Sequence, residues 1–201
     1  MVLVITMQLK RVNKSAYKRY AKYHYLKSSP MLVKATYEAW VDGVAVGCLV
    51  ICYPFPRCRG RHGKLKELNV SVGQSKQMAS TNRQVERIAR IVVLPKYRRH
   101  GMARQMIRKY LNRSKTKYVE VVSMPKLKAL FLSCGMAVTE YINAKNDKMI
   151  HCWSSRSTDR RRTAHTFPPT EFSSAEGDMD NRFIYFEHHR YIYGKQWRQR
   201  K

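Results

Sequence analysis

The sequence predicts an α/β (α+β) fold in which helices flank a mixed β-sheet, and three observations carry this prediction. Residues 86–124 read as strand, helix and strand, a unit whose two strands lie parallel with a right-handed crossover. Two strand-like runs within 35–56 flank Asp42-Gly43, which is a strong hairpin signal. With 44% hydrophobic residues among 201, the chain can bury a substantial core.

The first part of the chain supplies the expected N-terminal elements. Residues 1–9, MVLVITMQL, alternate weakly and read as a first strand. Asn13 or Ser15 caps a helix that runs to about Leu26. Residues 57–80, which follow the hairpin, are basic and contain Gly, Ser and Gln, so they predict a loop or an insertion.

The second part alternates strands and helices. Apolar residues at helical spacing mark one helix, and a proline and a glycine mark the start and end of the next. The expected elements are strands at about 86–94, 117–124 and 148–155, a helix at about 102–113, and a helix from Pro125 to Gly135.

The composition changes after about residue 155. Residues 156–201 begin with a polar stretch rich in turn residues and end in the aromatic and basic segment RFIYFEHHRYIYGKQWRQRK. They hold ten Lys and Arg against six Asp and Glu, whereas residues 1–155 hold thirty against seven and so carry +23 of the net charge. We expect a folded domain over 1–155 and a C-terminal extension over 156–201, which either packs on the domain or stacks on unpaired bases.

The net charge of +27 is the most unusual property of the composition. It attracts polyanions, so nucleic acid is the first candidate partner and an anionic membrane surface the second. No apolar run approaches the roughly 18 residues of a membrane-spanning helix, and the N-terminus lacks the basic start of a signal peptide. Five cysteines without close pairing are typical of a reduced, cytoplasmic protein. Cys58 and His62 have a loose ligand spacing but no second pair, so no structural zinc site is expected.

One motif raises the question of a bound phosphate. In RIVVLPKYRRHGMARQMI, residues 90–107, a strand runs into a proline, three consecutive basic residues, a glycine and a helix. A glycine at such a junction lets backbone N–H groups approach an anion, and the helix N-terminus adds partial positive charge. The alternative is a solvated basic turn, which a chain this basic offers in many places.

The stretch VVLPKYRRHGMA resembles the signature of the GNAT (Gcn5-related N-acetyltransferase) superfamily, a strand and a proline followed by Arg/Gln-x-x-Gly-x-Gly/Ala. The order of elements over about 5–155 is similar to that family, and SMPKLKALFLSCGM resembles its last helix. The resemblance implies an acyltransferase that uses acetyl-CoA or a related acyl-CoA. Its pyrophosphate would lie on the loop and helix start, and its pantetheine arm along the strand. The implied cofactor-binding residues are Val92, Val93, Leu94, Arg98, Arg99, His100, Gly101, Met102 and Ala103.

Three further stretches, YHYLKSSP, VDGVAVGCLVICYP and TNRQVERIARIVVLP, resemble a subgroup of GNAT proteins common in phages and prokaryotes. The phage Mom proteins, which modify the exocyclic amine of adenine in DNA, are similar to this subgroup, as are plain GNAT relatives without a DNA role. The Mom-like resemblance implies a site that contains His24, Tyr25, Asn82, Arg87, Arg90 and Ser123. It also implies a carboxylate and a tyrosine late in the domain, for which Glu140 and Tyr141 are the nearest pair. A metal stays open, with His24, Tyr25, His151 and His188 as conceivable ligands.

Several of these residues have a structural alternative. His24 is either a core histidine or faces the cleft, and Tyr25 points roughly 100° away from it on a helix, so both cannot be core. An arginine inside an apolar strand is costly unless it is paired. Arg90 is therefore either bonded to a carboxylate or in contact with a substrate phosphate or developing charge. Ser123 either caps a helix or polarises the thioester and relays a proton.

Acyl transfer to an amine needs a base for the amine and an acid for the leaving thiolate. Residues 1–155 contain seven carboxylates. Of these, Glu120 lies on the strand beside the expected cofactor and is a base candidate, although it could equally pair with Arg90. The candidate catalytic residues are therefore His24, Tyr25, Arg90, Glu120, Ser123 and Tyr141.

Basic side chains suit contacts to the backbone phosphates of double-stranded DNA. The candidates are Arg57, Arg59, Arg61, Lys64, Arg108, Lys109 and Arg113. The sequence thus favours an acyl-CoA-dependent transferase acting on nucleic acid, most concretely a Mom-like modification of DNA adenine. The alternatives are an ordinary N-acetyltransferase of a protein or small-molecule amine, and a non-enzymatic nucleic-acid-binding protein on a GNAT scaffold. The oligomeric state is not predicted.

Overall fold

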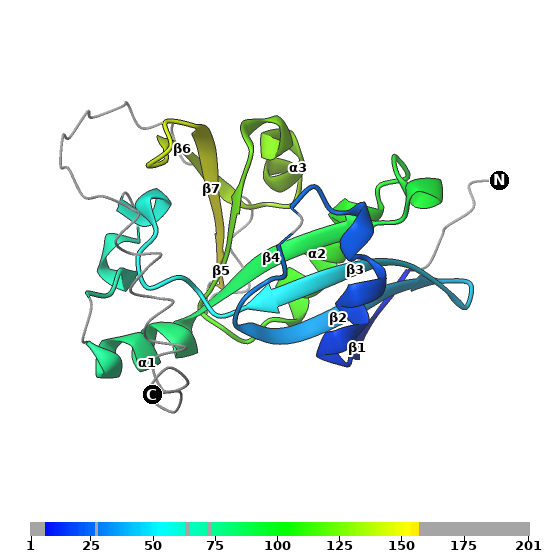
Figure 1. Cartoon of the computed structure of the whole chain (residues 1–201), viewed down its shortest axis with the longest axis horizontal. Coiled ribbons are helices and arrows are strands. Elements are labelled where there is room, and N and C mark those ends of the chain that lie inside the picture. The colour runs from blue at the N-terminus through cyan, green and yellow to red at the C-terminus, as the bar shows by residue number, and fades with distance from the viewer. Residues whose placement is uncertain (1–6, 27, 63–64, 72–73, 157–201) are drawn as a thin grey trace, which may run out of the picture.

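The described residues of a computed structural model, 7–26, 28–62, 65–71 and 74–156, form one mixed sheet of seven strands with the order β1-β2-β3-β4-β5-β7-β6 (Figure 1). Only β4 and β5 pair in parallel among these strands. The strands are β1 (Gln8–Val12), β2 (Val33–Val41), β3 (Val44–Cys52), β4 (Val85–Val93), β5 (Tyr118–Ser123), β6 (Ala137–Ile142) and β7 (Lys148–Ser155). The predicted mixed sheet is confirmed.

Three α-helices and six 3₁₀ turns complete the described part of the chain. The α-helices are α1 (Ser75–Gln84), α2 (Met102–Arg113) and α3 (Lys128–Ser133). The 3₁₀ turns are η1 (Lys14–Arg19), η2 (Ala21–Tyr23), η3 (Arg59–His62), η4 (Lys66–Leu68), η5 (Pro95–Tyr97) and η6 (Pro125–Leu127). No helix among the described residues is both long and apolar enough to cross a membrane.

The hairpin of β2 and β3 forms at the predicted turn. Asp42 and Gly43 both have positive φ angles, 47° and 75°, as a two-residue turn of this kind requires. Asp and Gly tolerate this conformation better than other residues, which is why the pair marks the turn in the sequence.

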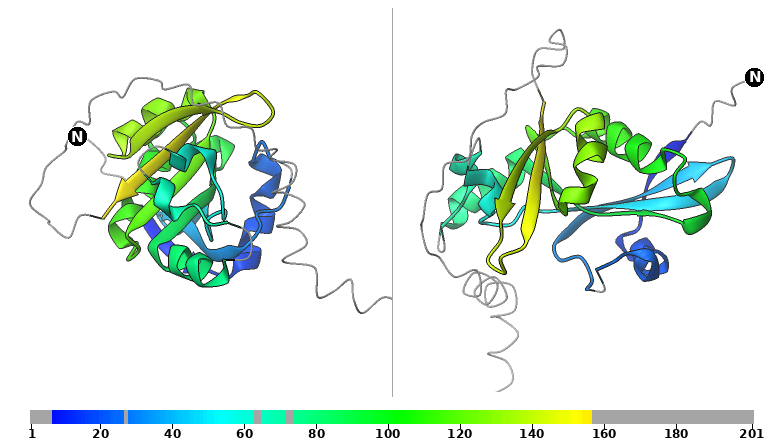
Figure 2. Two further views of the ribbon diagram at one scale, coloured as in Figure 1. Left: turned by 90° about the vertical axis from the view of Figure 1, so that its left-hand side faces the viewer. Right: turned by 90° about the horizontal axis from the view of Figure 1, so that it is seen from above.

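The sheet buries apolar side chains on both faces. Met106 and Ile107 of α2 pack with Leu49 and Ile51 in one cluster, whereas Tyr17 and Tyr20 pack with other residues of β3 in a second cluster. Figure 2 shows α2 and the η1–η2 segment on opposite sides of the sheet. Since β3 is covered on both faces, it reads as a continuous apolar run rather than an alternating one.

The two parallel strands separate soon after they meet. Their pairing runs from Val85 with Tyr118 to Arg87 with Glu120 and then stops, although both strands continue. Beyond this point the edges of β4 and β5 that face each other have no strand partner in the described part of the chain. A bulge at Ala89, where Arg90 pairs with Val50 and Ile88 with Ile51, adds a further irregularity on the β4 side.

Four sequence expectations need correction or fall outside the described residues. The helix expected from Asn13 to Leu26 is the pair of turns η1 and η2, and the loop expected at 57–80 contains η3, η4 and the start of α1. Strand β6 was not expected at all. The strand expected at 1–9 begins at Gln8, and residues 1–6 and the extension beyond 156 lie outside the described residues.

Candidate functional site

A cavity of about 510 Å³ lies where β4 and β5 separate. Its walls come from residues 88–93 of β4, residues 121–123 of β5, the start of α2 and the flank of α3. The segment 23–25 forms a further wall. No Asp or Glu lies among the described residues that line it.

The start of α2 forms a wall of this cavity and presents backbone N–H groups. Gly101 is the N-cap with a φ of 73°, and no side chain caps the helix. The first backbone bond at this end runs from the Gln105 N–H to the Gly101 carbonyl, so the N–H groups of Met102, Ala103 and Arg104 have no partner within the helix. An added Cβ at Gly101 would meet no atom within 4 Å, so glycine is needed there for its φ angle and not for space.

Two arginines place positive charge beside these N–H groups. Arg98 and Arg99 line the cavity and are exposed to solvent. Arg98 also donates from Nε to the Val93 carbonyl at 3.0 Å and from Nη2 to the Tyr23 carbonyl at 3.4 Å. It therefore ties the loop both to β4 and to the last residue of η2. His100 is exposed and lies outside the lining, as does Leu94.

The segment 23–25 brings aromatic side chains to the cavity. His24 is only 8% exposed and its ring stacks on that of Tyr25, with 4.5 Å between the centroids. Nδ1 of His24 accepts a hydrogen bond of 3.0 Å from the Leu26 N–H. Burial lowers the pKa of His24, and the charge of Arg90 lowers it further. His24 is therefore neutral with its proton on Nε2, which makes it a hydrogen-bond donor toward a ligand.

Arg90 lines the cavity and is 8% exposed. Its Nη1 donates to the Ala89 carbonyl at 2.8 Å and its Nη2 to the Ser28 carbonyl at 3.1 Å. Nε is buried without a hydrogen-bond partner. No carboxylate among the described residues pairs with Arg90, so the first of its two sequence interpretations, an ion pair within the chain, does not hold there.

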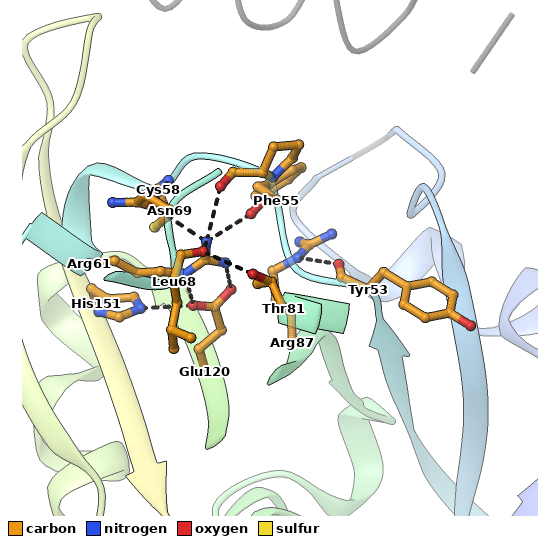
Figure 3. A network of polar contacts seen from close by, with 11 residues as sticks. Tyr53, Phe55, Cys58, Arg61, Leu68, Asn69, Thr81, Arg87, Glu120 and His151 are labelled. Atoms are coloured by element: carbon orange, nitrogen blue, oxygen red, sulfur yellow. Dashed lines mark hydrogen bonds and ion pairs between the residues drawn. The ribbon is translucent and has the colours of Figure 1, made fainter. Parts of the chain in front are cut away.

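Glu120 lies in a buried polar network outside the cavity lining (Figure 3). Its Oε1 and Oε2 accept hydrogen bonds from Nη2 and Nε of Arg61 at 2.5 and 2.7 Å, and His151 Nε2 lies 3.1 Å from Oε2. Burial alone would raise the pKa of Glu120, but the charge and hydrogen bonds of Arg61 outweigh it and lower the pKa to about 2. A carboxylate held this way is a weak base, and its partner is Arg61 rather than Arg90.

The same network explains the path of the loop after β3. Arg61 is fully buried and its Nη1 also donates to the Phe55 carbonyl at 2.8 Å. An added Cβ at Gly60 would lie 2.1 Å from the Cβ of His151, so η3 packs directly against β7 only because residue 60 is glycine. Arg61 is thus unable to contact DNA as predicted, since it is buried in an ion pair that anchors this loop.

The other predicted catalytic residues divide between the cavity and its surroundings. Ser123 and Tyr25 line the cavity, as do Val92, Val93, Met102 and Ala103 among the predicted cofactor residues. Tyr141 is half-buried on β6 and lies outside the lining, and Glu140 beside it forms an exposed ion pair with Lys128. Asn82 and Arg87 also lie outside the lining. Of the conceivable metal ligands, His24 and Tyr25 lie together at the cavity, His151 lies in the Glu120 network, and His188 lies outside the described residues.

The predicted nucleic-acid contacts other than Arg61 are on the surface where they are described. Lys109 is exposed on α2, and Arg108 and Arg113 on the same helix donate to the Ser133 and Leu9 carbonyls. Arg57 and Arg59 are half-buried near η3, where Arg57 donates to Ser71. Lys64 lies outside the described residues.

Sequence reasoning missed part of the cavity. Tyr23 and Tyr97 line it, and α3 contributes an apolar wall. Tyr23 adjoins the quoted His24-Tyr25 pair, so the aromatic run YHY was the available signal. The residues of α3 carry no such signal, because an apolar helix face reads as core whether it packs on a strand or borders a cavity.

Part of the chain is similar in sequence to a known family, and its fold is similar to that of solved structures. Residues 67–149 match the family model described as acetyltransferase (GNAT) domain. No curated protein matches the chain. Arabidopsis thaliana NAA60 in complex with acetyl-CoA is similar with a TM-score of 0.51 at 12% identity, over 75% of this chain and 100% of that one. A Bacillus subtilis acetyltransferase in complex with CoA has a TM-score of 0.46 at 10% identity, over 76% and 100% of the two chains.

The predicted fold class follows from these findings and the topology. The similarity to NAA60 rests on the fold, since the identity is too low to carry more. The diverging parallel strands and the glycine-capped helix α2 lie within the matched segment. Residues 67–149 therefore match the acetyltransferase (GNAT) domain family, and the sheet and helices around them have the GNAT fold.

Proposed function

We propose that the chain is an acyl-CoA-dependent N-acyltransferase whose cofactor binds in the cavity between β4 and β5. The observation that carries this proposal is the cavity itself. It is lined both by the start of α2, with its free N–H groups, and by the edges of β4 and β5 that have no strand partner among the described residues. The N–H groups and Arg98 and Arg99 suit a pyrophosphate. The edge of β4 at Val92 and Val93 suits an extended chain that contains amides.

The cofactor supplies an acyl thioester, and the chain contributes positioning and hydrogen bonding. Neutral His24 offers its Nε2 proton within the same cavity as Ser123. Both can donate hydrogen bonds to oxygen or sulfur that gains negative charge during transfer. Glu120 takes no part, because it is bound to Arg61 outside the lining.

The charges around the cavity favour an acceptor amine that is uncharged. Arg90 gives the cavity positive charge, and no described carboxylate lines it to attract an ammonium group or to remove its proton. A lysine or polyamine acceptor would arrive protonated and be repelled. An exocyclic amine of a nucleobase is neutral at pH 7 and comes attached to an anionic backbone, which the net charge of +27 attracts.

Aromatic side chains at the cavity support a nucleic-acid acceptor. Tyr25 is 54% exposed and Tyr23 36% exposed, and both line the cavity. Exposed tyrosines beside basic residues are suited to stack on a base that has left its helix. By the resemblance described above, the adenine exocyclic amine in DNA is the concrete candidate. The buried free cysteines support the expected reducing, cytoplasmic compartment.

Two measurements test this proposal. Titration of the purified protein with acetyl-CoA should give saturable binding, and its absence would refute the cofactor assignment. Turnover of acetyl-CoA should then be compared for single-stranded DNA, duplex DNA, a lysine peptide and spermidine, together with nucleoside mass spectrometry of DNA from expressing cells. A mass increase on deoxyadenosine supports the acceptor. Turnover with the peptide or spermidine alone would assign an ordinary N-acetyltransferase instead.

A further inference from the structure

Arg90 is a nearly buried cation that lacks a counter-ion among the described residues. Its two hydrogen bonds run to the neutral carbonyls of Ala89 and Ser28, and its Nε has no partner. The charged or titratable groups that influence it are His24, which is neutral, Cys52, whose pKa is raised by burial, and Arg87, a second cation. Nothing in this set compensates the charge.

A buried charge without a partner lowers the stability of the fold. Arg90 sits on β4 directly after the bulge at Ala89, and its Cα partner across the strands is the buried Val50. If residue 90 served the fold alone, an apolar side chain would suit this buried position better than an arginine. Arg90 lines the cavity together with His24 and Tyr25, so a ligand in the cavity can reach it.

The position of Arg90 separates it from the cofactor phosphates. The N–H groups of α2 and the side chains of Arg98 and Arg99 already provide one anion-binding wall. Arg90 pairs with Val50, and Val50 packs with Tyr17 and Tyr20 on the η1–η2 side of the sheet, whereas Met102 and Met106 of α2 pack on the other side. A second anion would therefore be bound on the other side of the sheet from α2.

We infer that Arg90 binds an oxyanion carried by the acceptor, next to the amine that is acylated. A guanidinium binds phosphate or carboxylate oxygens strongly, and Nη1 and Nη2 of Arg90 each keep a second N–H beyond the one given to the Ala89 or Ser28 carbonyl. In a nucleic-acid acceptor this oxyanion is a backbone phosphate adjoining the target nucleotide. The inference rests on the proposed function for the acceptor, but the anion site itself can be tested without one.

The first experiment measures anion binding by thermal unfolding at saturating CoA. Sulfate and acetate are titrated separately into the wild type, Arg90→Met, Arg90→Lys and the control Arg83→Met, whose arginine is exposed on α1. We expect the anion-induced rise in Tm to be equal in the wild type and Arg83→Met, smaller in Arg90→Met and intermediate in Arg90→Lys. An effect of sulfate indicates a phosphate-type site and an effect of acetate a carboxylate-type site. Equal rises in all four proteins would overturn the inference.

The same variants separate binding from a structural role. Without added anion, Arg90→Met should unfold at the same temperature as the wild type or higher, because it removes an uncompensated charge and keeps the bulk. If Arg90→Met and Arg90→Lys both unfold several degrees lower and neither responds differently to anions, the arginine serves the fold alone. Acetyl-CoA affinity, measured by calorimetry, should be unchanged. If the wild type bound no acetyl-CoA, the proposed function would be refuted, and the anion comparison among the same four proteins would be made without CoA.

Steady-state kinetics with single-stranded DNA complete the test. Arg90→Met should raise the KM for DNA by about tenfold or more, since a charge-assisted hydrogen bond is lost, and leave the KM for acetyl-CoA unchanged. The kcat should change far less than the KM. A fall in kcat at constant KM would instead assign Arg90 to charge that develops during transfer and would overturn the inference.

Discussion

Arg61 and Glu120, fifty-nine residues apart in sequence, form a two-pronged ion pair in which both side chains are fully buried. The pair joins η3, in the loop after β3, to β5, and His151 on β7 completes it (Figure 3). This network lies beside the point where β4 and β5 stop pairing, since Glu120 is the last residue of β5 that pairs with β4. The network therefore fixes the position where β4 and β5 separate.

Removal of the Glu120 charge should destabilise the protein without blocking transfer. Glu120→Gln leaves Arg61 buried and uncompensated, so we expect a loss of about 3–5 kcal/mol in the free energy of unfolding. Glu140→Gln is the matched control, because it breaks the exposed pair with Lys128 and should cost less than about 1 kcal/mol. Urea denaturation measures both. A variant of unchanged stability that loses kcat would restore Glu120 as the base.

The ion pair also predicts an acid-sensitive fold. Glu120 has a pKa of about 2 when folded and an ordinary value of 4.5, so its contribution to stability is complete above pH 4.5 and is lost as the pH falls toward 2. As the pH is lowered through this range, the free energy of unfolding should fall steeply in the wild type and less steeply in Glu120→Gln. Some slope will remain in the variant, since hydrogen bonds to Lys34, Tyr110 and Ser114 also lower the pKa of Glu86. If the free energy of unfolding depended on pH equally in both proteins, Glu120 would not be the source of the acid sensitivity.

The sheet and the cofactor end of the cavity could be predicted because their signals are local. Asp42-Gly43 marks its hairpin in two residues, and the strand, proline and glycine before α2 lie within one short segment. Helix α1 was not predicted because only Met78 and Ala79 of its ten residues, SKQMASTNRQ, are apolar, so that it shows no apolar face. Strand β6 is a short edge strand whose residues are half-buried or exposed, so its pattern is weak.

The partners of buried charges could not be predicted from local sequence. Arg61 reads as one of many basic loop residues, and only the folded chain brings it to Glu120. For the same reason the sequence could not decide whether Arg90 pairs with a carboxylate of the chain or contacts a ligand. The structure places Arg90 at the cavity and no described carboxylate next to it.

His24 should set the acid limit of activity. Because burial lowers its pKa from 6.5, the neutral form persists through the neutral range. Protonation at lower pH places a hydrogen on Nδ1 and breaks the hydrogen bond from the Leu26 N–H that orients the ring. We expect kcat/KM for the acceptor to be flat between pH 7 and 8 and to decline only at an acid pH below the ordinary histidine pKa of 6.5. In His24→Gln the activity should be lower by about 100-fold or more and this acidic decline should disappear. The control is His100→Gln, which is exposed and outside the cavity lining. If the acidic decline in kcat/KM persists in His24→Gln, the titration of another group causes it.

Gly101→Glu should abolish acetyl-CoA binding and leave the protein folded. The φ of 73° strains any side chain by about 1–2 kcal/mol, but no atom lies within 4 Å of an added Cβ. A carboxylate at a helix N-terminus is also favourable by about 0.3–1 kcal/mol, which offsets part of the strain. The new charge instead repels the cofactor phosphates from the free N–H groups of Met102 to Arg104.

Gly43→Glu provides the matched control for that variant. Gly43 has a φ of 75° and equal free space around an added Cβ, but it lies in the hairpin turn away from the cavity lining. Both variants should therefore show a similar fall in Tm, whereas calorimetry should detect acetyl-CoA binding only in Gly43→Glu. DNA affinity, measured by fluorescence anisotropy, should be similar in the two. If Gly101→Glu kept its acetyl-CoA affinity and lost DNA binding, the basic loop before α2 would belong to the acceptor surface instead.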